Sequence, residues 1–414
     1  MSGVPPAAIP ATTPRPLSIF IVAAEESGDA LGGALARALG AKYGGALKLD
    51  GVGGRAMAAA GIASPFPVED LSIIGLTAIP ARLPLIFRRI RETVDAIVKA
   101  KPDALVIIDS PDFTHRVARR VRRLAPTIPI VDYVSPSVWA WRPGRARAMR
   151  AYVDHVLAIL PFEPATHVEL GGPPCLYVGH PLIERITDLR PNAEEALRRR
   201  TDPPVVLVLP GSRKSEIHRL LGMFGAAVQR VAARAGPLEL VLPTVPQLRE
   251  QVERDVAGWV VKPRVIVEPA EKWAAFRTAR AALAASGTVT LELALAGVPT
   301  VAAYRVPVIE EVILRLVRLL ARLHSVILAN LVLGENVIPE YLQRDCTPDN
   351  LAAALLPLLS ETPERKRQVE AFRRLDAVMA IGQAVPSGNA AAIVLDVARR
   401  GRRDVAAIAA PPQS

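Results

Sequence analysis

The segment LSIFIVAAEESGD, residues 17–29, determines the class of fold. Its first seven residues, Leu17 to Ala23, are almost all apolar, as in a parallel strand that is buried on both faces. The polar turn AEESGD follows and leads into a helix-like stretch that reaches Ala38. A buried strand, a polar turn and a helix form the repeating unit of an α/β fold.

The same unit recurs along the N-terminal half. Apolar runs at residues 104–108, 128–133 and 155–159 each end in a turn that contains polar residues or proline. Basic amphipathic stretches at residues 88–99 and 116–124 lie between them and are predicted to be helices. This alternation predicts a doubly wound parallel sheet.

A second set of strands begins after a charged stretch, residues 188–202, and the break Pro203-Pro204. Its apolar runs lie at residues 205–209, 238–242, 264–267, 281–284 and 300–303. We therefore expect two Rossmann-like α/β domains with a hinge near residues 185–204. The predicted division is a leader at 1–16, an N-terminal domain at 17–190, a C-terminal domain at 191–385, and a C-terminal helix with a basic tail at 386–414.

Composition narrows the class of protein. Two cysteines in 414 residues argue against a disulfide scaffold and a cysteine-based zinc cluster. The net charge of +11 suits anionic lipid headgroups, phosphorylated small molecules or nucleic acid. Only 4% of residues are aromatic, so stacking surfaces are scarce and no nucleic-acid partner is expected. The longest uncharged stretch, residues 377–395, is too polar to span a membrane, and residues 1–16 do not resemble a secretory signal, so we expect a cytoplasmic protein.

In open α/β sheets, ligands bind at the carboxyl ends of the strands. The first such turn contains Glu25, Ser27, Gly28 and Asp29, which present ligand-binding groups or form an ordinary helix start. In the next turn, Asp109 directly follows a strand and is expected to face the cleft between the domains. Its carboxylate can take a proton from an attacking hydroxyl, or it can cap a helix.

A third turn, residues 134–142, has the sequence VSPSVWAWR. Its Ser135 and Trp139 suit the wall of a sugar or acyl site, and a rigid loop packed against the sheet would have the same composition.

Two turns of the second domain are candidates for binding phosphate. Gly211, Ser212 and Arg213 follow a strand and open a helix, where backbone N–H groups and a guanidinium can hold a pyrophosphate. The alternative is a surface pair between Arg213 and Glu216. Further along, backbone donors and a ribose-binding carboxylate are expected from Ser286, Gly287, Thr288 and Glu292.

The six histidines form no HxxxH or HExxH pair, and no metal is expected. Two stretches predict contact with a membrane surface. Residues 81–89 mix large apolar residues, among them Leu83 and Phe87, with arginines. Residues 312–323 place Arg315, Arg318 and Arg322 on one face of an apolar helix, which is typical of an interfacial helix and also of a core helix with a solvated stripe.

Taken together, these motifs resemble the lipid-A-disaccharide synthase family, glycosyltransferase family 19. The matching segments follow the family's order across about residues 17–360: AAEESGD, GVGG, LSIIGLTAIPARLP, IIDSPDF, YVSPSVWAWR, AILPFE, VGHP, LPGSR, ASGTVTLE and CTPDNLAAAL. YVSPSVWAWR, and LPGSR together with ASGT, are the most specific of them.

The resemblance implies a GT-B fold, two Rossmann-like domains that face a central cleft, and an inverting transfer that needs no metal. It implies that UDP-2,3-diacylglucosamine condenses with 2,3-diacylglucosamine 1-phosphate (lipid X) to a β-1,6-linked disaccharide 1-phosphate and UDP, in lipid A biosynthesis of Gram-negative bacteria. Asp109 would be the base and Arg213 would stabilise the leaving pyrophosphate. Asn330 would join the other donor-site candidates, and Glu25, Ser27 and Asp29 would lie on the cleft face.

Because both implied substrates carry acyl chains, the expected location is peripheral, on the inner face of the cytoplasmic membrane. Two alternatives stay open: another GT-B enzyme that acts on UDP-N-acetylglucosamine, such as a muramyl-lipid transferase or a 2-epimerase, and a non-catalytic module that binds nucleotide sugars or anionic lipids. The sequence leaves acyl-chain length and the formation of a homo-oligomer undetermined.

Overall fold

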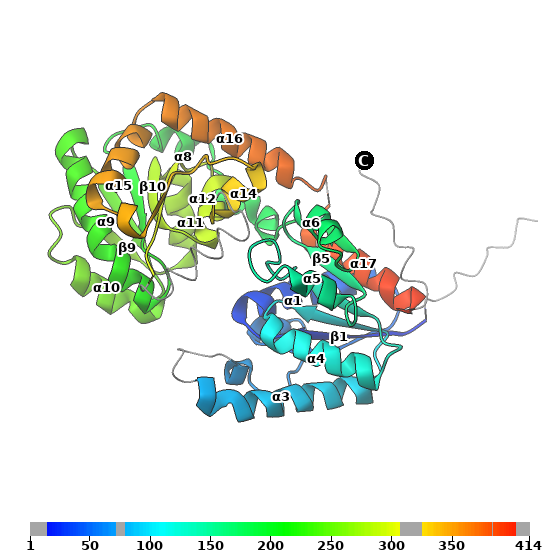
Figure 1. The fold of residues 1–414 in the computed structure, drawn as a ribbon. Coiled ribbons are helices and arrows are strands. Elements are labelled where there is room, and N and C mark those ends of the chain that lie inside the picture. Colours follow the sequence, from blue (N-terminus) through cyan, green and yellow to red (C-terminus); the bar gives the residue numbers. More distant parts are fainter. Residues whose placement is uncertain (1–14, 72–78, 307–324, 383, 403–414) are drawn as a thin grey trace, which may run out of the picture. The chain divides into compact units, whose positions relative to one another are not determined.

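The computed structural model describes residues 15–71, 79–306, 325–382 and 384–402 (Figure 1). The chain divides into two compact units, one from residues 1–181 and 381–414 and the other from residues 182–380. The sequence-based boundary lies at 190/191, and it left residues 386–414 outside both domains. Each unit is described by itself below.

The first unit is built on a sheet of six parallel strands in the order β2-β1-β3-β4-β5-β6. The strands are β1 (Leu17–Ala23), β2 (Leu47–Val52), β3 (Ala104–Ile108), β4 (Ile130–Tyr133), β5 (His155–Ala158) and β6 (Cys175–Tyr177). Because alternate side chains of a strand point to opposite faces, Ile19 and Ile21 enter one core while Phe20 and Val22 enter the other.

Helices cover both faces of this sheet (Figure 1). They are α1 (Glu26–Lys42), α2 (Arg55–Ala59), α3 (Ile79–Ala100), α4 (Pro111–Leu124), α5 (Gly144–Met149), α6 (Glu163–Glu169) and α17 (Pro386–Arg400). On one face, Leu35 of α1 and Val394 of α17 pack with the sheet, and on the other Ile90 of α3 and Val117 of α4 do so. The last helix therefore completes the core of the N-terminal unit.

The second unit has the same architecture, a parallel sheet in the order β12-β11-β10-β7-β8-β9. Its strands are β7 (Val205–Leu209), β8 (Glu239–Pro243), β9 (Arg264–Ile266), β10 (Ala281–Ala285), β11 (Thr300–Tyr304) and β12 (Glu340–Leu342). Its helices are α7 (Ile186–Leu189), α8 (Ala193–Arg198), α9 (Lys214–Ala235), α10 (Arg249–Val256), α11 (Pro269–Thr278), α12 (Thr288–Leu295), α14 (Leu328–Leu333), α15 (Pro348–Leu355) and α16 (Pro363–Met379).

The predicted class, doubly wound α/β, is confirmed. The nine apolar runs predicted as strands are all strands, with ends that differ by at most two residues. The prediction omitted β2, β6 and β12, which are three of the four strands at sheet edges. An edge strand is paired and covered on fewer sides, so its sequence lacks the continuous apolar run that marks a central strand.

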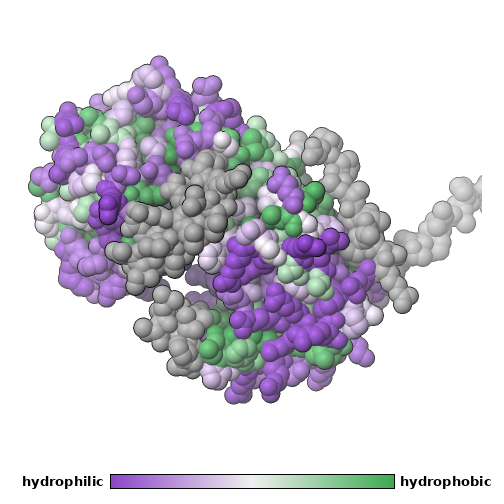
Figure 2. Space-filling view, viewed as in Figure 1, coloured by the Kyte–Doolittle hydropathy of each residue, from purple (hydrophilic) through white to green (hydrophobic). Residues whose placement is uncertain are grey.

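Hydrophilic residues make up most of the visible surface of each unit (Figure 2). Within the described part of the chain, no helix combines the length and apolar character that a membrane crossing requires.

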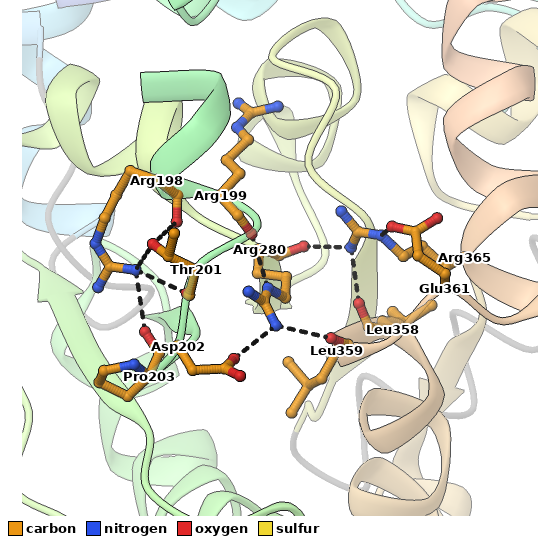
Figure 3. A network of polar contacts seen from close by, with 10 residues as sticks. All are labelled: Arg198, Arg199, Thr201, Asp202, Pro203, Arg280, Leu358, Leu359, Glu361 and Arg365. Atoms are coloured by element: carbon orange, nitrogen blue, oxygen red, sulfur yellow. Dashed lines mark hydrogen bonds and ion pairs between the residues drawn. The ribbon is translucent and has the colours of Figure 1, made fainter. Parts of the chain in front are cut away.

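Arginines fasten the segment after α8 to the amino-terminal edge of the second sheet (Figure 3). Arg280, directly before β10, donates to the carbonyls of Arg199 and Leu359 at 2.7 and 3.2 Å and pairs with Asp202 at 3.0 Å. Arg365 on α16 donates in turn to the carbonyl of Arg280 at 2.7 Å. Main-chain oxygens of the loops are thus held by side chains from the sheet and from α16.

Arg199 links this segment to two helices of the second unit. Its guanidinium donates to carbonyl oxygens at the ends of α11 and α12, namely those of Phe276, Arg277, Ala296 and Gly297, at 2.6–3.3 Å. A cation at a helix C-terminus interacts favourably with the helix dipole. The pKa of Arg199 is lowered to about 10, mainly because the guanidinium is buried and also because of the nearby charges of Arg365 and Arg190.

We predict that Arg199→Met destabilises the second unit by about 2–4 kcal/mol, because four partly buried carbonyls lose their donor. Urea unfolding would measure this loss. Arg200→Met is the matched control, since Arg200 is exposed and surface changes usually stay within about 0.5 kcal/mol. Equal stability of the two variants would contradict a structural role for Arg199.

Candidate functional site

Asp109 lies at the carboxyl edge of the first sheet, directly after β3, in a strained turn. Both Asp109 and Ser110 have a left-handed backbone, with φ of 49° and 44°. The buried hydroxyl of Thr114 donates to the Asp109 carbonyl at 2.6 Å, and the Ser110 N–H donates to the Asp109 carboxylate at 2.7 Å. Left-handed non-glycine residues are uncommon and cluster at functional sites, so the turn holds this carboxylate in a specific orientation.

The surroundings of Asp109 make it a stronger base than a free aspartate. Burial raises the pKa of the Asp109 carboxyl, and the negative charges of Glu25 and Asp132 raise it further. Hydrogen bonds from the Ser110 N–H and the Ser27 side chain lower the same pKa, although the net direction is upward. A carboxylate with a raised pKa accepts a proton more readily.

The loop at residues 134–142 lies beside Asp109 at the same edge, since the Asp109 N–H donates to the Tyr133 carbonyl at 3.2 Å. Ser135 is buried, and its hydroxyl lies 2.8 Å from Nε2 of His167. The half-buried indole of Trp139 donates to Glu163 at 3.3 Å and packs edge-on against Phe162. Ser135 is thus part of a packed loop, and a rigid packed loop is one of the two interpretations that the sequence left open.

The first turn divides into exposed and buried residues. Glu25 and Ser27 are exposed, and both act on the pKa of Asp109. Gly28 is buried at the start of α1, where an added Cβ would lie 3.4 Å from the Ile108 carbonyl. This is an ordinary van der Waals distance, so α1 packs against the end of β3 at this position without requiring a glycine.

Asp29, predicted for the cleft face, is instead a buried structural anchor. Its carboxylate accepts backbone N–H groups from Gly54, Ala56 and Met57 at 2.7–3.0 Å. A carboxylate that caps the start of α2 in this way satisfies donors of the helix N-terminus. The turn after β2 is thereby fixed to α1, and the Asp29 carboxylate is engaged with protein donors.

The phosphate-binding candidates of the second unit surround one cavity of about 410 Å³ at the carboxyl edge of the sheet. Its lining includes seven of the eight predicted donor-site residues: Gly211, Ser212, Arg213, Ser286, Gly287, Thr288 and Glu292. Lys272, Thr244 and Tyr304 also line it, and none of them was predicted from the sequence.

Two carboxylates already engage the cations of this cavity. Glu216 pairs with Arg213 at 3.1 Å and also accepts the N–H groups of Ser212 and Arg213 at 3.1 and 3.3 Å. The side chain of Arg213 is nevertheless 78% exposed, so it is free to turn toward a ligand. Glu292 pairs with Lys272 at 2.7 Å.

Asn330 belongs to the core of the second unit and is not part of the cavity lining. It is fully buried, and its amide group contacts Ser325, Val337 and Ile338 at 2.9–3.1 Å. These hydrogen bonds fix the loop between α14 and β12. The structure therefore gives this donor-site candidate a structural role.

The membrane-contact candidates are described only in part. Leu83 and Phe87 on α3 are 38% and 43% exposed, and the Arg116 guanidinium lies over the Phe87 ring at 5.6 Å. Arg315, Arg318 and Arg322 lie outside the described residues. Across the described ranges, no group of three or more His, Cys, Asp or Glu side chains is arranged to hold a metal ion.

Several solved structures share this fold. S. aureus MnaA with UDP matches 96% of this chain and 100% of its own, with a TM-score of 0.60 and 14% identity. MurG of Acinetobacter baumannii matches 92% of this chain and 100% of its own, with a TM-score of 0.57 and 16% identity. At these identities the likeness concerns the fold alone, and it shows that the two α/β units form a GT-B-like architecture.

Sequence comparison is more specific. The family described as lipid-A-disaccharide synthetase matches residues 19–394. The lipid-A-disaccharide synthase of Bradyrhizobium diazoefficiens is 60% identical over 93% of this chain and 97% of its own length. That of Rhodopseudomonas palustris is 60% identical over 94% of this chain and 98% of its own. The chain therefore belongs to the lipid-A-disaccharide synthase family and is a glycosyltransferase of lipid A biosynthesis.

Proposed function

We propose that the chain joins UDP-2,3-diacylglucosamine to 2,3-diacylglucosamine 1-phosphate (lipid X), with Asp109 as the base. The observation that carries this assignment is a partly buried carboxylate of raised pKa, held in a strained turn at the carboxyl edge of the first sheet. The products are a β-1,6-linked disaccharide 1-phosphate and UDP.

The bond changes follow from an inverting displacement. The 6-hydroxyl oxygen of lipid X attacks the anomeric carbon of the donor and forms the new C–O bond. The hydroxyl proton passes to Asp109, and the bond between the anomeric carbon and the pyrophosphate oxygen breaks with its electron pair on UDP. The base must be ionised to act, so the rate falls as the pH drops through the raised pKa of Asp109.

The leaving group is stabilised by the cavity of the second unit. Arg213 supplies a forked donor for the charge that grows on the pyrophosphate, and the N–H groups of Gly287 and Thr288 at the start of α12 supply further donors. The Ser286 N–H is already bonded to the Ala303 carbonyl at 2.9 Å. Glu292 accepts ribose hydroxyls in this proposal, and Lys272, its partner at 2.7 Å, orients the carboxylate. In this proposal, these protein donors stabilise the charge of the leaving group, which a metal ion does in other transferases.

We further propose that the protein works at the cytoplasmic face of the inner membrane as a peripheral protein. Both substrates carry acyl chains, the net charge is +11, and α3 exposes Leu83 and Phe87 beside arginines. Exposed apolar side chains next to cations bind anionic bilayers through both burial and charge.

Asp109→Asn should lower kcat by about 100- to 10,000-fold, the range that general-base catalysis contributes. The affinity for UDP should be unchanged, because Asp109 belongs to the first unit and the proposed UDP cavity to the second. Release of UDP from the donor, with and without lipid X and in EDTA, measures the rate. Near-normal turnover by this variant would overturn the base assignment.

The same assay separates the alternatives. Release of UDP that requires lipid X, with a disaccharide 1-phosphate detected by mass, supports the proposed reaction. Turnover only with non-acylated UDP-N-acetylglucosamine would favour a muramyl-lipid transferase or an epimerase, and binding without any turnover would favour a binding module.

Arg213→Ala should weaken UDP binding about 10- to 150-fold, because a charge-assisted contact to phosphate is worth about 1.5–3 kcal/mol. Titration calorimetry with UDP would test this. Arg230→Ala is the control, since Arg230 lies on α9, the helix that follows Arg213, and pairs with Asp349 away from the cavity lining. A UDP affinity that is equal in both variants would leave Arg213 without its proposed role.

Replacing Leu83 and Phe87 together by Glu should abolish co-sedimentation with anionic liposomes, because α3 would lose its apolar contact and gain repulsion. Val378→Glu is a control of equal exposure, 43%, on α16. Unchanged binding of the double variant would exclude this face, and the Glu variant of Arg315, Arg318 and Arg322 would then test the second predicted stretch.

A further inference from the structure

Helix α6 holds the loop at residues 134–142 through two side chains that the mechanism above does not use. Glu163, its first residue, accepts the indole N–H of Trp139 at 3.3 Å. His167, one turn later, contacts the Ser135 hydroxyl at 2.8 Å. The two contacts reach the start and the middle of the loop from one short helix.

Glu163 is unusual because it is a carboxylate with only 2% of its surface exposed. It accepts the Leu160 N–H at 3.0 Å in addition to Trp139, and the Ile159 N–H also bonds to it. Acidic side chains are almost never fully buried unless their oxygens are paired. Here the partners are N–H groups of the turn after β5 and of the loop.

The loop needs such restraint because its backbone is strained. Val134 has a φ of 81°, which is an outlier for a β-branched residue, and Arg142 at the other end has a φ of 55°. Strained residues persist only where surrounding contacts determine them. The contacts from α6 are therefore part of what keeps the loop in its observed shape beside Asp109.

We propose that Glu163 is a positioning residue for the acceptor: it fixes Trp139, and through it the loop that lies next to the base. This inference rests on the proposed function, in which the carboxyl edge of the first sheet receives lipid X. Glu163 acts through Trp139 and touches neither the base nor the reacting atoms.

The charge state of Glu163 provides a measurable signature. The pKa of Glu163 is raised to about 7, mainly because the carboxyl is buried and also because of the charge of Asp132 on β4, while its three N–H donors act in the opposite direction. Cys175 and Tyr177 of β6 face it, and burial moves the pKa of each upward, so both stay neutral near pH 7. His167 on α6 has a lowered pKa and is neutral there as well.

The direction of the effect follows from the hydrogen bonds. An ionised carboxylate accepts N–H groups more strongly than a protonated one, so the loop is held more tightly above pH 7 than below it. Glu163→Gln mimics the protonated form at every pH. Trp139→Phe breaks the same contact from the other side and keeps an aromatic ring against Phe162.

The first measurement is intrinsic fluorescence between about pH 5.5 and 8.5 in the free protein. The wild type should show a transition near pH 7 that is absent in Glu163→Gln and in Trp139→Phe. Glu169→Gln, an exposed acid on the same helix, should keep the transition. Persistence of the transition in both Glu163→Gln and Trp139→Phe would overturn the proposal.

The second measurement is the KM for lipid X across the same pH range. We expect Glu163→Gln to raise this KM about five- to tenfold above pH 7, the effect of about one hydrogen bond, and to remove its pH dependence near 7. The affinity for UDP should not change. If Glu163→Gln does not fold, Trp139→Phe gives the same test.

The outcomes separate this inference from the proposed function. Lack of turnover with lipid X by the wild type, with the fluorescence transition present, would refute the function and leave the contact of Glu163 with Trp139 in place. An acceptor KM that is unchanged in Glu163→Gln and Trp139→Phe, or that rises together with the Kd for UDP, would refute the positioning role.

Discussion

The parallel pairing of β1, β3 and β4 is the constraint on which the rest of the first unit depends. Parallel strands end at the same edge of a sheet, so the turns at Ser27, Asp109 and Ser135 meet although they are far apart in sequence. The Asp109 N–H extends the ladder by one bond, to the Tyr133 carbonyl at 3.2 Å. The order of the strands therefore determines which residues lie near the proposed base. It places Asp132 of β4 close enough to raise the pKa of Asp109.

The central strands and the candidate base were predictable because their signals are local. An apolar run such as Val205–Leu209 is written directly in the sequence, and an aspartate that follows such a run must lie at the carboxyl edge. The edge strand β2 has the sequence LKLDGV, in which polar residues break the apolar run. The packing of α17 on the first unit was not predictable from its own residues. An apolar helix face shows that the helix packs on a core, but not which of the two sheets it covers.

The hydrogen-bond partners of other polar residues were not predictable, because the fold decides which donors and acceptors surround them. Asp29 lies in the first turn of a helix, where an acidic residue is typical, but its carboxylate accepts backbone N–H groups 25–28 residues away. Asn330 carries polar atoms that suit a ligand, yet the chain around it uses all of them. Glu163 stood within a segment that resembles the family, AILPFE, and its burial became apparent only from the fold. In each case the deciding quantity is which donors surround the polar group.

Buried carboxylates explain why this edge of the sheet suits a base. Asp132 is fully buried on β4, and Nε2 of His115 lies 3.1 Å from its carboxylate. Its charge raises the pKa of Asp109 and of Glu163, while burial raises both more strongly. Each such group is unfavourable for folding by itself, because burial opposes ionisation. Their grouping near the end of β4 therefore lowers the stability of the fold and at the same time provides a carboxylate that can take a proton near neutral pH.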